Sequence, residues 1–330
     1  MPRIDPEIEA FIPLLPKEDL TDPVADRRKA AERVASRQAI DTGDMHIEDR
    51  TVPSDPGVAV RVYRPRDFRG AVIWLHGGGF VVGGLDSEHP WAARIAQLSG
   101  AAVISVDYRL APEHRFPAQL DDAYAVLMWT AEHASELGID PERIAVGGHS
   151  AGGGLAAAVA LRARDEHGPR ICFQLLNEPG LDDRQQTWSQ RTFTDTPWSY
   201  RDKVTAAWRH YLGSVPANQY AAPMRATDVS GLPAAYIATA EFDPVRDEGI
   251  GYAVRLLQAG VQVELHQFPG TFHGSQVISA AEVSQRQIAG LAAALRRAVA
   301  EPAYTATRST LTSPERSSSE LAETISSTAR

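Results

Sequence analysis

One short stretch of the chain combines the residue types that nucleophilic catalysis requires. It runs from Gly148 to Gly152 with the sequence Gly-His-Ser-Ala-Gly, after an apolar run and before an Ala-rich segment. The apolar run is typical of a buried strand, and the Ala-rich segment is typical of a helix. A serine in the tight turn between them lies at a helix N-terminus, where backbone N–H groups favour developing negative charge. The pattern predicts that Ser150 is a nucleophile, and the alternative is a glycine-rich loop without chemistry.

A serine hydroxyl is a weak nucleophile at neutral pH, so Ser150 requires a base and an acid that orients it. In hydrolases with this turn, the acid and then a histidine follow the serine along the chain. The histidines after Ser150 are His167, His210, His266 and His273. We predict that His273 is the base, because it follows the last expected strand in a loop, 268–274, from which it can reach over the sheet edge. Its alternative role is a loop histidine that caps a backbone carbonyl.

The orienting acid is expected where another strand, 234–240, ends. Asp243 lies just past that strand, and Pro244 holds it in an extended conformation. We predict that Asp243 orients the base, with Glu241 as the alternative, since either carboxylate can orient an imidazole. Asp247 and Glu248 lie where the next helix begins, so they are expected to cap it.

Three consecutive glycines, at 77–79, follow the apolar run 71–75 and His76. Their backbone N–H groups can converge on one point, because no side chain obstructs them. Together with the N–H of Ala151 they are expected to form an oxyanion hole, while His76 braces the loop. A flexible loop and a phosphate-binding turn are the alternatives. The phosphate turn is disfavoured, because no G-x-G-x-x-G follows a first strand and no Gly-Lys-Ser/Thr is present.

The elements that position these residues alternate along the chain. Strands are expected at 71–75, 101–106, 144–146, 171–176, 234–240 and 261–266, and helices at 91–98, 120–133, 155–164 and 249–259. This alternation predicts a parallel sheet covered on both faces, with active groups at the carboxyl ends of its strands. Two further strands, 46–52 and 58–64, and an amphipathic helix, 23–38, are expected before them.

Two segments do not follow this alternation. Residues 182–212 carry six aromatic side chains, Trp188, Phe193, Trp198, Tyr200, Trp208 and Tyr211. We expect an insertion over the site, in which some rings line a pocket and others only pack. The last thirty residues, 301–330, include thirteen Ser or Thr and few large apolar side chains, which predicts a disordered tail.

The bulk composition narrows the class of protein. The chain has 330 residues, of which 43% are hydrophobic and 23% charged, as in a globular protein with a sizeable core. A net charge of −9 without a basic stripe argues against a nucleic-acid or anionic-membrane surface, and the apolar runs are too short to span a bilayer. No secretory signal is visible, and the single Cys172, expected in a buried strand, cannot form an internal disulfide. A cytoplasmic protein is therefore expected.

Five blocks in this order resemble the bacterial hormone-sensitive-lipase family of α/β-hydrolases. They lie at 76–79, 107–118, 148–152, 243–249 and 272–274. The resemblance spans roughly residues 11–301 and implies an α/β-hydrolase fold, with a mostly parallel eight-stranded sheet flanked by helices. It also implies a small helical cap from residues 1–45 and the insertion 182–212, on a catalytic domain of residues 46–300.

The resemblance also implies an activity. It predicts a carboxylesterase for short-acyl esters with Ser150, Asp243 and His273 as its triad. The implied oxyanion hole consists of the N–H groups of Gly77, Gly78 and Ala151. No cofactor and no metal are implied; the expected partner is a small ester substrate, and a homodimer is expected because members often form dimers.

Two positions depart from the family pattern. The residue before the nucleophile is more often Asp in this family, whereas here it is His149, a change that can shift the local charge and the optimum pH. Where many members have Tyr-Pro after the sixth strand, this chain has Asn-Glu-Pro-Gly at 177–180, so the pocket wall is expected to differ there.

Three other functions compete with the esterase hypothesis. The same triad can serve an amide or N-acyl hydrolase of a small metabolite, and the sequence does not separate that bond from an ester. A ligand receptor on a lapsed hydrolase fold is disfavoured, because such proteins usually lack a triad member and none is missing here. A membrane-associated lipase for long chains needs a large exposed apolar lid, and the cap segments are too charged for one.

Overall fold

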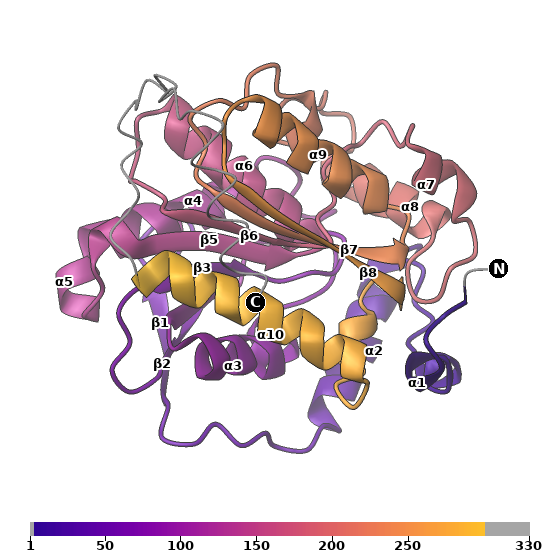
Figure 1. Cartoon of the computed structure of the whole chain (residues 1–330), viewed down its shortest axis with the longest axis horizontal. Coiled ribbons are helices and arrows are strands. Elements are labelled where there is room, and N and C mark those ends of the chain that lie inside the picture. Colours follow the sequence, from indigo (N-terminus) through magenta and orange to yellow (C-terminus); the bar gives the residue numbers. More distant parts are fainter. Residues whose placement is uncertain (1–2, 301–330) are drawn as a thin grey trace, which may run out of the picture.

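The computed structural model describes residues 3–300, so the tail predicted over 301–330 lies outside the described residues. The described part contains one eight-stranded sheet with the strand order β1-β2-β4-β3-β5-β6-β7-β8 (Figure 1). Strand β1 (His46–Val52) pairs antiparallel with β2 (Val58–Arg64), which pairs antiparallel with β4. All other neighbouring pairs are parallel, and the expectation of a mostly parallel eight-stranded sheet is confirmed.

The parallel part of the sheet has six strands, and the site described below lies at their carboxyl ends. They are β3 (Ala71–Leu75), β4 (Ala102–Val106), β5 (Ile144–His149), β6 (Phe173–Asn177), β7 (Ala235–Phe242) and β8 (Val263–Phe272). Every residue of β3 and of β4 is buried, because helices cover both faces of the sheet there. Burial on both faces explains why these strands are continuous apolar runs in the sequence.

Helices cover the two faces of the sheet (Figure 1). One face carries α3 (Leu85–Ser99) and α10 (Glu282–Ala300), and the other carries α4 (Ala118–Glu132), α6 (Ala151–Asp165) and α9 (Arg246–Gln258), while the short α5 (Ala134–Leu137) follows α4. Each face has its own cluster of buried apolar side chains. Helix α10 was not predicted, although Ile288, Leu291, Leu295 and Val299 recur at helical spacing.

Two boundaries differ from the prediction in ways that matter for the site. Strand β8 continues through Pro269 to Phe272, so His273 directly follows a strand and the predicted loop 268–274 is wrong. An edge strand tolerates a proline, because one of its sides needs no N–H donor. Cys172 is half-buried and lies just before β6 rather than inside it, so its expected place in a strand is also wrong.

Short helices from two distant parts of the chain lie at the carboxyl ends of the strands (Figure 1). They are α1 (Pro6–Glu9) and α2 (Pro23–Ala35) near the N-terminus, and α7 (Trp188–Thr192) and α8 (Arg201–Leu212) in the insertion. Leu20 is buried in a cluster with Ala206 and Ala207 of α8, and the ring of His210 bonds to the Leu20 carbonyl at 2.8 Å. The N-terminal segment and the insertion therefore support each other. Among residues 3–300, no helix is both long and apolar enough to cross a membrane.

Glu248, in the first turn of α9, ties the insertion to the sheet. Its side chain is fully buried. It accepts hydrogen bonds from the backbone N–H groups of Leu181 (2.5 Å) and Asp182 (2.6 Å) and from the side-chain amide of Gln190 (3.1 Å). Its neighbour Asp247 accepts the N–H of Ser189 at 2.8 Å. The predicted capping of α9 by these two carboxylates is therefore wrong, because both bond to the insertion instead.

We expect Glu248→Ala to lower the free energy of unfolding by about 3–5 kcal/mol, because it leaves three buried donors without an acceptor. Urea unfolding, followed by fluorescence, measures this change. The matched control is Glu142→Ala, which breaks an exposed ion pair with Arg170 and is expected to change the free energy by less than about 0.5 kcal/mol. Equal losses in both variants would contradict the role of Glu248.

Candidate active site

Ser150 occupies the turn between β5 and α6 in a strained conformation. Its φ is +57°, a left-handed value that few residues other than glycine adopt. The turn closes only because its neighbours lack side chains. A Cβ on Gly148 would lie 2.4 Å from the backbone of Gly152, and a Cβ on Gly152 would lie 2.0 Å from the Leu75 carbonyl oxygen. The geometry places the Ser150 hydroxyl at the N-terminus of α6, above the carboxyl ends of the strands.

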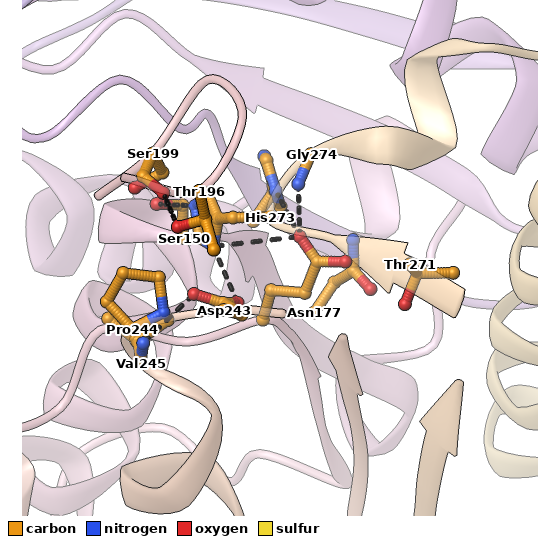
Figure 2. A network of polar contacts seen from close by, with 12 residues as sticks. Ser150, Asn177, Thr196, Ser199, Asp243, Pro244, Val245, Thr271, His273 and Gly274 are labelled. Atoms are coloured by element: carbon orange, nitrogen blue, oxygen red, sulfur yellow. Dashed lines mark hydrogen bonds and ion pairs between the residues drawn. The ribbon is translucent and has the colours of Figure 1, made fainter. Parts of the chain in front are cut away.

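The side chains of Ser150, His273 and Asp243 point toward one another and form a hydrogen-bonded chain (Figure 2). Ser150 Oγ lies 2.8 Å from His273 Nε2, and His273 Nδ1 lies 2.8 Å from Asp243 Oδ2. The other carboxylate oxygen of Asp243 accepts the N–H of Val245 at 2.9 Å, which fixes the carboxylate. The structure thus brings together the three residues that the sequence singled out, from the ends of β5, β7 and β8.

Glu241, the alternative acid, has a different partner. Its carboxylate accepts the backbone N–H of Gly270 at 2.7 Å and so fixes β8 beside the register shift in its pairing with β7. Among the hydrogen bonds of the described residues, the ones to the His273 ring come from Asp243 and Ser150 and not from Glu241. The geometry favours Asp243 as the orienting acid.

The glycine loop after β3 faces Ser150. A Cβ on Gly77 would lie 3.5 Å from Ser150 Cβ, and Gly78 has a φ of +111° with the Val82 carbonyl oxygen in the place of a side chain. His76 Nδ1 bonds to the Gly77 carbonyl at 2.7 Å, and burial lowers the pKa of His76 to about 4, so its ring is neutral. Its expected role as a brace of this loop agrees with that bond.

A pocket of about 170 Å³ opens onto Ser150 and His273. Its walls come from the N-terminal segment, the glycine loop and the insertion, and they include Leu20, Phe80, Val82, Trp198, Val204 and Trp208. The aromatic rings of the insertion divide as expected, since two tryptophans line the pocket while Tyr211 stacks behind it on Phe80, with 3.8 Å between ring centroids. A cavity of about 150 Å³ holds a molecule the size of benzene, so this pocket suits a small group.

One residue of the site, Glu178, was not predicted from the sequence. It follows β6, is buried, and accepts the N–H of Gly274 at 2.7 Å. Its Oε2 atom also lies 3.2 Å from His149 Nε2 and 3.8 Å from His273 Nδ1. The two departures from the family pattern therefore contact each other beside His273. The sequence offers one indication of this contact, which is charge: His149 replaces an acidic residue of the family pattern, and Glu178 introduces one.

Several ionisable groups set the protonation of His273. Burial alone would lower the pKa of His273, but the charge and hydrogen bond of Asp243, and then the charge of Glu178, raise it above its ordinary value. The more distant ammonium group of Lys203 in α8 acts in the opposite direction. The two carboxylates therefore outweigh burial and Lys203, and they favour the protonated imidazole.

The same cluster is the candidate for a metal site. His149, Glu178 and His273 each offer one donor atom, and these atoms lie within 4.8 Å of one another, the one such group in residues 3–300. Both ring nitrogens of His273 and the carboxylate of Glu178 already form hydrogen bonds, with Asp243, Ser150 and Gly274. The arrangement is therefore that of a hydrogen-bond network, and we assign no metal to it.

Known proteins resemble this chain over most of its length. Residues 72–277 match the family model described as alpha/beta hydrolase fold. Carboxylesterase NlhH of Mycobacterium tuberculosis is 44% identical over 271 residues, which cover 76% of this chain and 84% of the relative. Esterase LipI of the same organism is 38% identical over 282 residues, which cover 83% of this chain and 88% of the relative. A solved structure named Bacterial Heroin Esterase has a TM-score of 0.87 and 44% identity, over 90% of this chain and 98% of that one. The chain belongs to the α/β-hydrolase superfamily and, within it, to the bacterial hormone-sensitive-lipase family.

Proposed function

We propose that this protein, a carboxylic-ester hydrolase like its relatives, cleaves short-acyl esters with Ser150 as nucleophile, His273 as base and Asp243 as orienting acid. The observation that carries the proposal is the chain of two 2.8 Å hydrogen bonds that joins these three side chains. A hydroxyl bonded to an imidazole that is itself held by a carboxylate is the arrangement that activates serine.

The proposed reaction has two steps. His273 Nε2 takes the proton of Ser150 as Oγ attacks the ester carbonyl carbon, and the imidazolium then returns that proton to the departing alcohol. The product of this step is an acyl-enzyme, with the acyl group on Ser150 Oγ. Water enters next, gives a proton to His273 and attacks the acyl carbonyl carbon. The proton passes to Ser150 Oγ as the carboxylic acid leaves.

The negative charge that develops on the carbonyl oxygen requires donors, and we assign them to the N–H groups of Gly77, Gly78 and Ala151. No acceptor in the described part of the chain bonds to any of these three N–H groups. Ala151 is the first residue of α6, where the helix leaves its N–H groups unpaired. Three unpaired donors around Ser150 support this assignment.

We assign the cap to residues 1–45 and the insertion 182–212, and the catalytic domain to residues 46–300. The buried cluster that Leu20 forms with Ala206 and Ala207 supports this cap, because it joins the two segments.

The volume of the pocket indicates the size of the substrate. A pocket of about 170 Å³ between cap and nucleophile suits an acyl group of a few carbons. Cytoplasmic location and a homodimer stay predictions.

The activity is expected to fall at acidic pH. Asp243 and Glu178 raise the pKa of His273 above its ordinary value of 6.5, against the effect of burial. Because the base works only when it is neutral, kcat/KM is expected to decline tenfold for each pH unit below that raised pKa. A pH profile of kcat/KM between pH 5 and 9, with a short-acyl ester, measures the midpoint. A midpoint clearly below 6.5 would contradict the proposed environment of His273.

The experiment that tests the function is a panel of chromogenic esters with acyl chains from about two to sixteen carbons, beside an N-acyl panel. We expect kcat/KM to be highest at about two to four carbons. Cleavage of N-acyl substrates alone would indicate an amide hydrolase, and a preference for long chains would indicate a lipase. Silence on both panels would favour a lapsed receptor.

A further inference from the structure

The carboxylate of Glu178 lies on the same side of His273 as the carboxylate of Asp243. We propose that Glu178 is a positioning residue for ester hydrolysis, a second carboxylate that orients His273 and stabilises its protonated form together with Asp243. This inference rests on the proposed function, in which His273 is the base. It adds to the triad a residue that the family resemblance did not supply.

Three bonds hold Glu178 in this position. Its Oε2 atom accepts the N–H of Gly274 at 2.7 Å, and His149 Nε2 lies 3.2 Å away. Its Oε1 atom accepts the side-chain amide of Gln287, in α10, at 3.0 Å. The side chain is 1% exposed, and a buried carboxylate is costly unless such bonds compensate it. Glu178 also has a φ of +48°, a strained value for this residue type.

The bond to Gly274 connects Glu178 directly to the base. Gly274 follows His273, so a carboxylate on its N–H fixes the backbone that carries the imidazole. The same Oε2 atom lies 3.8 Å from His273 Nδ1, about 1 Å beyond the 2.8 Å bond to Asp243. A small rotation of the ring would bring Nδ1 within hydrogen-bond distance of Glu178. Glu178 can therefore replace Asp243 as an acceptor, although less well.

The charges around this group favour an ionised Glu178. Burial would raise the pKa of Glu178, but the hydrogen bond of His149 and the charge of His273 hold it below its ordinary value. Three other charged or titratable side chains face the two histidines: Asp243 and Lys203 on the side of His273, and Glu88 of α3 on the side of His149. Glu178 lies close to both rings, 3.2 Å from His149 Nε2 and 3.8 Å from His273 Nδ1.

The residue types at positions 149 and 178 support the same inference. At position 149 the family more often has Asp, whose shorter side chain would bring a second carboxylate toward Glu178 without reaching the place of His149 Nε2. Two carboxylates in one buried site repel each other, whereas a histidine donates to Glu178. The rings of His149 and His273 also stack, with 5.3 Å between centroids. His149 therefore accompanies Glu178 and holds it beside the base.

The first test is the pH profile of Glu178→Gln, which keeps the shape of the side chain and removes its charge. We expect the acidic midpoint of kcat/KM to move down by about one pH unit, because the protonated His273 loses one of its two carboxylates. The matched control is Glu241→Gln, another glutamate that bonds to a glycine N–H in the chain leading to His273. Its midpoint is expected to stay in place. Equal midpoints in wild type and Glu178→Gln would overturn the proposal.

The second test compares Asp243→Ala with Asp243→Ala/Glu178→Gln. Loss of the orienting acid lowers turnover about 10⁴-fold in other serine hydrolases. Here we expect Asp243→Ala to lose only about 10²-fold, since Glu178 accepts the Nδ1–H, and the double variant to lose about 10²-fold more. A loss of about 10⁴-fold in Asp243→Ala, with no further effect of Glu178→Gln, would overturn the proposal.

The two tests use different measurements, a pH midpoint and the size of a rate loss, and both require a wild type that hydrolyses an ester. Should Glu178→Gln fail to fold, Asp243→Ala alone decides, since about 1% residual activity supports a second carboxylate and about 0.01% contradicts it. Wild type that is silent on esters would overturn the proposed function itself. An active wild type with an unchanged profile in Glu178→Gln would overturn only the role of Glu178.

Discussion

Replacement of Ser150 by alanine is expected to lower kcat for a short-acyl ester about 10⁶-fold and to leave the fold intact. The variant removes the one hydroxyl that bonds to the His273 ring in the described structure. Without it no acyl-enzyme forms, and what remains is the effect of the oxyanion donors and of binding. Alanine keeps the Cβ that Ser150 already accommodates at a φ of +57°, so the turn carries no new strain.

The measurement is kcat under saturating substrate, with thermal unfolding of both proteins. We expect unfolding temperatures within about 2 °C of each other, so that the loss belongs to chemistry. Ser54→Ala is the matched control, because it also removes one serine hydroxyl, bonded to the Pro56 carbonyl in an exposed turn far along the chain from the site. It is expected to keep its turnover within about twofold. A Ser150→Ala enzyme that kept a tenth of its rate would refute the proposed nucleophile.

Much of the fold could be predicted because its strands are buried on both faces. Such strands are short apolar runs that the sequence shows directly, and the structure has β3 at the predicted residues 71–75. The end of β8 could not be predicted in this way, because Pro269 and Gly270 normally indicate that a strand has ended. Their tolerance depends on an edge position and on the bond from Gly270 to Glu241, which are tertiary features.

Local sequence motifs mark the nucleophile, its partners and the glycine loop. Glu178 has no such motif. Its role depends on the packing of β6 beside β5 and β7, which brings it to both His149 and His273. His149 and Glu178 lie 29 residues apart in the sequence, and the register of β5 and β6 brings them into contact. A contact of this kind joins residues from different strands, and no local motif predicts it.

The backbone conformation of the glycine loop leads to a prediction for the oxyanion hole. Gly78→Ala is expected to lower kcat about 10²–10³-fold with a smaller change in KM, the effect of losing one oxyanion donor. A Cβ at this position would lie 2.0 Å from the Val82 carbonyl oxygen, at a φ of +111° that alanine avoids. The loop must move, and its N–H groups move with it. Because these donors bind the transition state more strongly than the substrate, the loss falls on kcat.

The control for this variant is Gly100→Ala. Gly100 also has a positive φ, +69°, but it ends α3 and a Cβ there would meet nothing within 4 Å. Gly100→Ala is expected to cost about 1 kcal/mol of stability and to leave kcat unchanged, because strain without displacement does not reach the site. Steady-state kinetics and urea unfolding of both variants separate the two effects. If Gly78→Ala lost stability alone, as Gly100→Ala should, the loop after β3 would be a structural turn, and the oxyanion would have to be bound by other groups.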